Sequence, residues 1–475
     1  MDWRGGVMVE GGQAFLSAIG HVVLIYMAVV LAFYTFLLVV AFIHLRRTRR
    51  LDDWEPYEEL LDASYAKPIS ILVPAYNEEA GIVGSVRSLL AIEYPEYEVI
   101  VINDGSTDKT LKRLIDHFHL KPVYRVIRRQ LAAKEIKAVY QSPDYPHLFV
   151  LDKENGGKAD ALNAGINAAR YPYICSIDGD SVLERRAFLK VMKPMLESDG
   201  EVIASGGTVR IANGCRIERG EIVKVGLSRR PLVIMQTIEY LRAFLLGRLG
   251  LSRHNLLLIV SGAFGVFFKP WVIEAGGYTD TAGEDMELVV RLHRLAREKN
   301  EEKKIIYIPD PVCWTEAPET YGDLRRQRRR WHRGLLESLW MHRSMLFNPK
   351  YGSIGLLSLP YFWFIELLGP IVELMGYIVV VFSLFLGNLY VEFALLLLTV
   401  SVLYGSLLSA AAVLLEEWTE RKFPSISDLV KLFFFALTET FWYRPLTAWW
   451  RCEGVIDAVR RKKQWGSIKR KGVSV

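Results

Sequence analysis

The feature that most constrains the fold is the uneven distribution of apolar residues along the 475-residue chain. Half of the residues (51%) are hydrophobic, and they concentrate at 15–45 and again from about 354 to 450. About 20 apolar residues span a bilayer, so 15–45 predicts one long or tilted transmembrane helix, preceded by a short polar segment at 1–14. The stretch between the two apolar regions has the composition of an ordinary soluble domain. The sequence therefore predicts a soluble domain inserted between membrane segments.

Basic residues set the predicted orientation. Four arginines within 46–50 follow the first apolar segment, which by the positive-inside rule puts that end in the cytoplasm and the N-terminus outside. After the soluble domain we expect an interfacial helix at 354–368, two transmembrane helices within 370–415 and a second interfacial helix at 427–450. A basic cytoplasmic tail follows at 451–475. These segments predict a multi-pass protein of the cell membrane whose soluble domain is cytoplasmic.

The soluble domain is expected at 68–345, after a linker at 46–67 that is first basic and then acidic. Short β-branched runs alternate there with helical patterns; the predicted strands start at Pro68 and lie further along at 98–103, 148–151, 173–177, 202–210 and 305–309. Such repeats favour an α/β fold with a Rossmann-like, mostly parallel sheet and right-handed crossovers. The segment 231–250 predicts an amphipathic helix in the membrane surface, with a buried core helix as the alternative.

The charge and cysteine content narrow the function classes. The net charge of +6 comes from local clusters, and we find no RNA- or DNA-binding module, so nucleic acid is not an expected partner. The four cysteines have neither metal-ligand nor disulfide-framework spacing, which fits a reducing, cytoplasmic setting.

Two carboxylates end the predicted strand at 173–177. Asp178 and Asp180 flank one glycine, at the sheet edge where ligands of open α/β folds bind. Such a pair suits a hard cation, Mg²⁺ or Mn²⁺, held beside phosphates. A solvated Asp-Gly turn is the alternative. Upstream, a Gly-Gly turn leads to Lys158 at a helix start, a pattern that attracts phosphate but is also common in linkers.

Two helices of the soluble domain carry further candidates. Glu284 and Asp285 begin one helix, where the helix dipole alone would favour acids. In the other helix Gln327, Arg330 and Trp331 lie on one face, and the tryptophan offers a stacking surface beside an anion-binding arginine. The small residues of Ser261–Gly265 would let the backbone approach a ligand closely.

Taken in order, these signals resemble the membrane-integrated processive family 2 glycosyltransferases, which include cellulose, chitin, hyaluronan and poly-N-acetylglucosamine synthases. The family signature is D, DxD, (T/G)ED and (Q/R)xxRW. It is matched here by Asp104, by Asp178-Gly179-Asp180, by Gly283-Glu284-Asp285 and by Gln327-Arg328-Arg329-Arg330-Trp331. The resemblance covers about 68–345 and implies a GT-A type fold.

The resemblance also implies roles for single residues. Asp285 would be the general base, and Asp180 with Asp178 would bind Mg²⁺ or Mn²⁺ on the donor diphosphate. The implied nucleotide-binding residues are Ala75, Tyr76, Glu78, Asp104, Lys158 and Asp178. The implied diphosphate- and acceptor-binding residues are Gln327, Arg330, Trp331, Gly262, Ala263 and Glu284.

Three functional hypotheses follow. The first is an inverting transferase that moves a sugar from a UDP-sugar, UDP-GlcNAc or UDP-Glc, to the end of a β-linked polysaccharide while the product crosses the membrane, with an accessory export subunit as a possible partner. The second is transfer of a single sugar to a lipid acceptor. The third is a nucleotide-sugar-binding membrane subunit without catalysis, which would not need Asp285 as a base.

Overall fold

A computed structural model of the protein describes residues 3–52, 66–179, 181–218, 221–385, 405–415 and 425–460, together with Leu396, Thr399 and Glu417. The strands of its large sheet are β1 (Ile69–Ala75), β2 (Tyr97–Asp104), β3 (Lys121–Pro122), β4 (Ile136–Gln141), β5 (Leu148–Lys153), β6 (Tyr173–Ile177), β7 (Val182–Leu183), β8 (Val202–Ile211), β11 (Phe264–Phe268) and β12 (Lys304–Thr315). They form one sheet in the order β3-β4-β5-β2-β1-β6-β11-β8-β12-β7. A separate hairpin pairs β9 (Arg216–Glu218) with β10 (Glu221–Lys224).

The large sheet is mostly parallel, as the strand–turn–helix pattern predicts. The pairs β5–β2, β2–β1, β1–β6 and β8–β12 are parallel, and β4, β7 and β11 run against the other seven strands. Strand β1 is apolar except for Ser70 and is almost wholly buried, as expected for a central parallel strand. Because β1, β2, β5 and β6 are parallel, their carboxyl ends meet at one edge, and this edge carries the candidate site.

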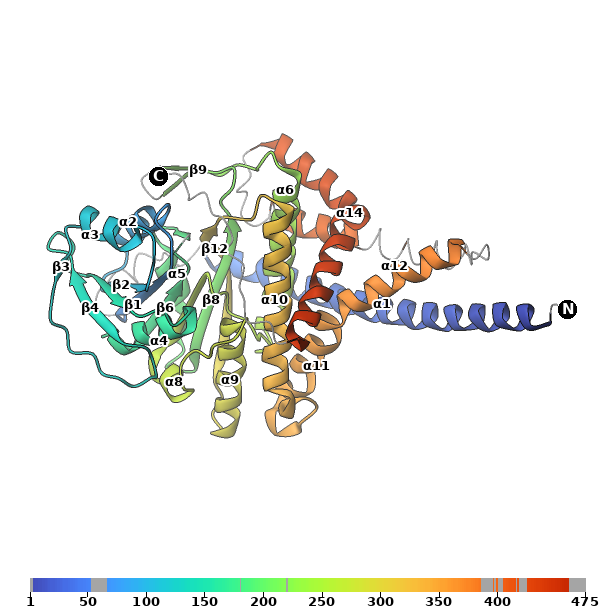
Figure 1. The fold of residues 1–475 in the computed structure, drawn as a ribbon, viewed down its shortest axis with the longest axis horizontal. Coiled ribbons are helices and arrows are strands. Elements are labelled where there is room, and N and C mark those ends of the chain that lie inside the picture. The colour runs from blue at the N-terminus through green and yellow to red at the C-terminus, as the bar shows by residue number, and fades with distance from the viewer. Residues whose placement is uncertain are drawn as a thin grey trace.

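Helices cover the sheet, and further helices lie between the sheet and the apolar helices (Figure 1). Those of the soluble domain are α2 (Ile82–Leu90), α3 (Thr110–His117), α4 (Lys158–Ala168), α5 (Ala187–Glu197), α8 (Lys269–Glu274), α9 (Glu284–Glu298) and α10 (Tyr321–Met341). Helix α4 packs on β1 and β2, and α5 packs on β8 and β12. Helix α10 contacts α9 as well as the long helix α14 (Ile426–Val459), so it joins the soluble domain to the C-terminal region.

Two helical stretches among the described residues are long and apolar enough to cross a membrane, Ala18–Arg46 and Ile354–Phe382. Only 11% and 22% of their most apolar windows are buried inside the protein, whereas a core helix would be mostly buried. Figure 1 shows α1 (Trp3–Asp52) and α12 (Gly369–Phe385) projecting from the same side of the sheet domain, and the two helices touch. These features support a membrane protein.

The helix bounds differ from the expected segments. Helix α1 includes 3–14 and continues through the arginine cluster, because no proline interrupts it and arginine is a good helix former. Pro360 lies inside a continuous helical stretch, in α11 (Leu359–Tyr361) between the π-helices η5 (Ile354–Ser358) and η6 (Phe362–Leu367). Local π-helical turns re-pair the backbone groups that a proline frees, so 354–368 continues towards α12 as one apolar stretch rather than ending as a separate interfacial helix. Most of the expected linker, the crossing beyond 385 and the tail after 460 lie outside the described residues.

The helix predicted in the membrane surface at 231–250 is instead a buried one. It comprises α6 (Pro231–Leu241), the π-helix η2 (Arg242–Arg248) and α7 (Leu249–Ser252). Apolar side chains around its circumference are buried, among them Val233, Ile238 and Leu245. The helix packs against α1, β8, β12 and α14. Most of its side chains are buried, including the polar Gln236 and Glu239, so the alternative expectation of a buried helix is the one that holds.

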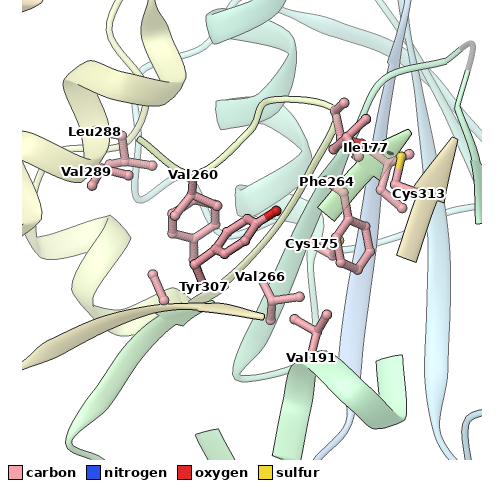
Figure 2. Close-up of a cluster of buried hydrophobic side chains, with 14 of the residues drawn as sticks. Cys175, Ile177, Val191, Val260, Phe264, Val266, Leu288, Val289, Tyr307 and Cys313 are labelled. Carbon is pink, nitrogen blue, oxygen red and sulfur yellow. Dashed lines mark hydrogen bonds between the residues drawn. The ribbon is translucent and has the colours of Figure 1, made fainter. Parts of the chain in front are cut away.

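The core beneath the site is formed by β6, β11 and β12 (Figure 2). Cys175 of β6, Val266 of β11 and Tyr307 of β12 are buried there with Val191 of α5 and Leu288 of α9. The Tyr307 hydroxyl lies 2.6 Å from Oγ1 of Thr208, so its polar atom is satisfied inside the core. This packing fixes the start of α9 relative to the carboxyl edge of the sheet.

Candidate functional site

A cavity of about 1190 Å³ opens at the carboxyl edge of the sheet and extends between η2, α10 and the helices that follow α10. Every described residue named as a candidate from the sequence lines it: Ala75, Tyr76, Glu78, Asp104, Lys158, Asp178, Gly262, Ala263, Glu284, Asp285, Gln327, Arg330 and Trp331. The remaining candidate, Asp180, lies outside the described residues. Residues spread over more than 250 positions of the chain therefore share one wall.

At the sheet end of the cavity, Asp104 holds the glycine turn before α4. Its Oδ1 accepts a hydrogen bond from the Gly156 amide (3.0 Å), and its Oδ2 accepts one from the Gly157 amide (2.8 Å). The buried Lys153 ammonium lies 2.6 Å from Asp104 Oδ1 and 2.6 Å from Asp160 Oδ1. The carboxylate thus orders the start of α4, where free N–H groups favour an anion.

Lys158 connects two of the acidic motifs. Its Nζ lies 2.8 Å from Asp178 Oδ1 and 2.9 Å from Glu284 Oε1, so one ammonium joins β6 to the start of α9. Burial alone would lower the pKa of Lys158, but Asp178 and Glu284 hold it above its ordinary value. Lys158 is therefore a fixed positive charge at the point where the glycine turn and the two carboxylates meet.

Asp285 lies in the first turn of α9, with both carboxylate oxygens held by backbone amides. Oδ2 accepts a hydrogen bond from Gly262 N (2.9 Å) and Oδ1 accepts one from Met286 N (2.8 Å). Burial raises the pKa of Asp285, the neighbouring charge of Glu284 raises it further, and Lys158 and the two amides offset part of the effect. A carboxylate with a raised pKa in a cavity has the properties of a general base.

Gly262 allows this close approach. A Cβ atom at this position would lie 3.1 Å from Lys158 Nζ and 3.2 Å from Asp285 Oδ2. A side chain here would therefore press on both charged groups, which gives a physical reason for the small residues of the Ser261–Gly265 loop.

The helix α10 contributes Gln327, Arg330 and Trp331 to the same wall. The Gln327 side chain is buried, and its Oε1 has no hydrogen-bond partner within the described part of the chain. Trp331 is 41% exposed, and the Arg328 guanidinium lies 4.5 Å from the centroid of its ring. The indole thus presents an open face backed by a cation.

The other arginines of α10 bind carboxylates, although a run of charges is more often a solvated face or a lipid-headgroup contact. Arg325 and Arg329 pair with Glu453 and Asp457 of α14. Arg328 is fully buried and donates to Glu239 of α6 at 2.7 Å. The run therefore attaches α10 to α6 and α14.

Aromatic and acidic side chains from the apolar helices line the far end of the cavity. The Glu366 carboxylate accepts hydrogen bonds from the hydroxyls of Tyr34 (3.1 Å) and Tyr361. All three residues line the cavity. A carboxylate within an apolar helix requires a polar partner, and Glu373 likewise accepts a hydrogen bond from the Tyr377 hydroxyl at 2.8 Å.

Sequence reasoning missed several residues of this wall. It also missed Lys153, which lies behind the wall: this last residue of β5 is fully buried against Asp104, and a charge at the end of a predicted parallel strand could have identified it. Glu239, Arg242 and Arg248 lie in a segment that is otherwise apolar, and charges in such a segment require partners when the helix is buried. The amphipathic interpretation assigned them to solvent and so removed that requirement.

The donor set at the end of β6 fits a hard divalent cation. Mg²⁺ is usually bound through one or two carboxylates together with substrate phosphates, and the described carboxylate of Asp178 lies at the cavity wall. No group of three His, Cys, Asp or Glu side chains suited to a metal occurs in the described part of the chain. A site completed by a diphosphate does not need such a group.

Comparisons with known proteins found similar sequences and a similar fold. Residues 66–334 match the family model described as glycosyltransferase like family 2, and residues 282–471 match the model of chitin synthase. A poly-beta-1,6-N-acetyl-D-glucosamine synthase of Staphylococcus epidermidis is 31% identical over 279 residues, which cover 57% of this chain and 56% of the relative. The synthase of Staphylococcus aureus strain COL is 31% identical over 269 residues, covering 56% of this chain and 54% of the relative. The chain thus spans little more than half the length of these relatives.

The fold has a solved counterpart. The mannosyltransferase PcManGT from Pyrobaculum calidifontis, solved in complex with GDP-Man and Mn²⁺, superimposes with a TM-score of 0.51 at 18% sequence identity. The match covers 88% of this chain and 99% of that chain. At this identity the likeness concerns the fold, which is the GT-A type predicted from the sequence.

Proposed function

The chain belongs to the glycosyltransferase-like family 2, and from this premise we propose that it transfers a sugar from a UDP-sugar to the end of a growing β-linked polysaccharide. The donor we propose is UDP-GlcNAc, because the relatives that match are poly-beta-1,6-N-acetyl-D-glucosamine synthases. The protein is multi-pass, with its catalytic domain cytoplasmic and its N-terminus outside, and passes the product across the bilayer.

The observation that carries this proposal is the placement of Asp285. Its carboxylate lies in the cavity wall next to Gly262, with Lys158 and Glu284 close by. An acceptor hydroxyl attacks C1 of the donor sugar, and the bond from C1 to the β-phosphate oxygen breaks, releasing UDP. Asp285 takes the hydroxyl proton. A single displacement of this kind inverts an α-linked donor to a β-linked product.

The remaining residues bind and orient the two substrates. Asp104 and the glycine turn it holds bind the nucleotide together with Ala75, Tyr76 and Glu78. Lys158 and Arg330 contribute positive charge for the diphosphate. Asp178 and Asp180 would hold Mg²⁺ or Mn²⁺, and the bound cation would supply positive charge for the leaving UDP. Trp331 stacks on the acceptor sugar, and Gln327 and the Gly262–Ala263 backbone line its site.

The test is a comparison of the wild type with Asp285→Asn in membranes. The wild type should convert UDP-GlcNAc into a polymer in the presence of Mg²⁺ or Mn²⁺, with one UDP released for each sugar incorporated. The variant should bind UDP normally but lose transfer. Wild-type turnover in Asp285→Asn would show that Asp285 is not the base. The residue could then contribute to binding the nucleotide-sugar, but not to catalysis.

Product length separates the two transfer reactions. The cavity continues from Trp331 to Tyr34 and Glu366 of the apolar helices, which supports a path long enough for several sugars. A product that never exceeds one sugar on a lipid would instead support single transfer to a lipid acceptor. A screen of donors that includes UDP-Glc and GDP-Man, read out by release of the nucleotide, would settle the donor.

A further inference from the structure

Arg248 lines the cavity but has no role in the reaction proposed above. It ends the π-helix η2 and lines the cavity together with Asp285 and Glu366. Its Nη1 atom is buried and has no hydrogen-bond partner among the residues that the structure describes. A buried donor without a partner costs free energy, so this nitrogen is a candidate for binding a ligand.

Neighbouring arginines of the same wall show the contrast. Arg242 lies 2.8 Å from Glu439, Arg328 lies 2.7 Å from Glu239, and Arg451 lies 2.8 Å from the other oxygen of Glu239. These pairs hold α6, η2, α10 and α14 together, which is a structural role. For the Nη1 of Arg248, no carboxylate from the described residues takes that place.

The orientation of Arg248 is fixed all the same. Its guanidinium lies over the ring of Phe244, 3.9 Å from the centroid. Burial lowers the pKa of Arg248, and the surrounding Tyr307, Asp285, Tyr240 and Glu366 offset part of this effect. Arginine stays ionised in proteins, so the group is a charged, oriented and partly desolvated donor.

We propose that Arg248 and Glu366 form an acceptor subsite, in which they bind a neutral sugar residue of the growing glycan on the membrane-helix side of Asp285. This inference rests on the proposed transferase function and deepens it. Arg248 donates hydrogen bonds to hydroxyl or carbonyl oxygens of the sugar, and Glu366 accepts from its hydroxyls. Phe244 and Tyr361 line the cavity beside them and hold the two groups in place, Phe244 by packing under the Arg248 guanidinium and Tyr361 by its hydrogen bond to Glu366.

The charges of this region favour a neutral ligand over an anion. Asp285 and Glu366 both lie close enough to Arg248 to act on its charge. Arg248 and these two carboxylates together carry one net negative charge, which disfavours a phosphate-bearing acceptor. A sugar needs both donors and acceptors, and this group of side chains provides both.

Calorimetry on the full-length protein tests the subsite independently of turnover. Short neutral N-acetylglucosamine oligosaccharides would be titrated into protein saturated with UDP and Mn²⁺. Arg248→Met should weaken oligosaccharide binding by at least about ten-fold and leave the affinity for UDP unchanged. Arg248→Lys should restore part of the affinity, because it keeps the charge but loses the planar fork. In the reaction, both variants should raise the KM for the acceptor. The rate at which water hydrolyses UDP-GlcNAc should fall by a smaller factor, because that reaction needs no glycan in the subsite.

The matched control is Arg253→Met, which changes an exposed arginine just beyond the same helical run and should bind oligosaccharide as the wild type does. Wild-type oligosaccharide affinity in Arg248→Met would overturn the subsite, as would a wild type that binds no oligosaccharide. If inorganic phosphate or a polyprenyl phosphate displaces the oligosaccharide from the wild type and binds only when Arg248 is present, the subsite binds an anion and the assignment of a neutral sugar is wrong. If the wild type makes no polymer but Arg248→Met still abolishes oligosaccharide binding, the subsite stands and the proposed polymerisation fails.

Discussion

Gly283 and Gly334 are in direct backbone contact. A Cβ atom on Gly334 would lie 2.6 Å from the backbone nitrogen of Gly283, and one on Gly283 would lie 3.1 Å from the backbone of Gly334. Gly283 immediately precedes α9 with its Glu284-Asp285 pair, and Gly334 follows Trp331 on α10 by one turn. Because neither glycine has a side chain, α9 and α10 can approach closely, and this approach sets the distance between the proposed base Asp285 and the proposed stacking residue Trp331.

Gly334→Ala should separate these two groups. Because the new methyl would overlap backbone that cannot rotate away, α10 must shift, at a cost of about 1–3 kcal/mol in the free energy of unfolding. We expect a lower kcat with a smaller loss of UDP affinity, because α10 contributes Arg330 to the proposed diphosphate site whereas the nucleoside is held at the sheet edge. Turnover, calorimetric UDP binding and thermal unfolding would measure the three effects.

Gly322→Ala is the control on the same helix. No atom of the described residues lies within 4 Å of a Cβ atom added there, so the change should leave turnover intact and keep or slightly raise stability, as glycine is a poor helix former. Equal losses in the two variants would mean that the Gly283–Gly334 contact does not control the site.

The sequence was sufficient to predict what depends on local pattern. The strand at 69–75 has an almost continuous apolar run, the carboxylates after 173–177 end a strand, and Gln327, Arg330 and Trp331 share a helical face; each of these is visible within a few residues. The Gly283–Gly334 contact joins positions 51 residues apart, so no local period reveals it. The same holds for the antiparallel strand β11, whose place between β6 and β8 depends on pairing rather than on its own sequence.

The rate of transfer should fall on the acid side of a pH profile because Asp285 acts as a base only when ionised. Burial and the charge of Glu284 raise its pKa, so the acid limb of kcat/KM should lie above the range of an ordinary aspartate. Glu284→Gln removes one of the causes, and the limb should move to lower pH. Asp285→Asn should lower kcat by about a hundred- to ten-thousand-fold at every pH.

An acid limb that stays in place in Glu284→Gln would assign the titration to another group. The Glu284 carboxylate also binds Lys158, so UDP affinity must be measured in the same variant to separate a binding effect from a shift of the base.

Lys153→Met should destabilise the nucleotide end of the site, where Asp104 holds the glycine turn before α4. The ammonium is wholly buried and neutralises Asp104 and Asp160. Its removal leaves carboxylates without their cation, which typically costs about 3–5 kcal/mol. We expect a lower Tm and weaker UDP binding, because Asp104 also holds the Gly156 and Gly157 amides.

Lys134→Met tests whether the effect requires burial. This exposed lysine donates to the Asn155 carbonyl oxygen at 2.6 Å, beside the same turn, and its loss should change Tm and UDP affinity little. A comparable loss in both variants would indicate that the turn is sensitive to any change nearby and that the buried pair has no special role.

Charged residues inside apolar segments explain the main error of the sequence interpretation. The helix 231–252 contains Glu239 and Arg242, which an amphipathic model places in water. In the structure both are paired across the cavity wall, Glu239 with Arg328 and Arg242 with Glu439. The partners are 89 and 197 residues away in the chain, so a hydropathy pattern alone could not distinguish a buried, paired face from a solvated one.

Removal of divalent cations should stop transfer, and Mn²⁺ or Mg²⁺ should restore it. Asp178 offers an oxygen ligand of the kind these ions prefer. Asp178→Asn should therefore raise the Mn²⁺ concentration for half-maximal activity by at least about ten-fold, since even substitutions outside the ligand shell cost about 10–100-fold in metal affinity. The measurement is initial rate against Mn²⁺ concentration after treatment with a chelator.

Glu284→Gln separates metal binding from the loss of the contact with Lys158. Asp178 and Glu284 both bind the Lys158 ammonium, at 2.8 and 2.9 Å, so each substitution removes one of its carboxylate partners. If Asp178 is a metal ligand, only Asp178→Asn should shift the Mn²⁺ dependence. An equal shift in both variants would show that the effect passes through Lys158, and the metal would then have to be held by other groups.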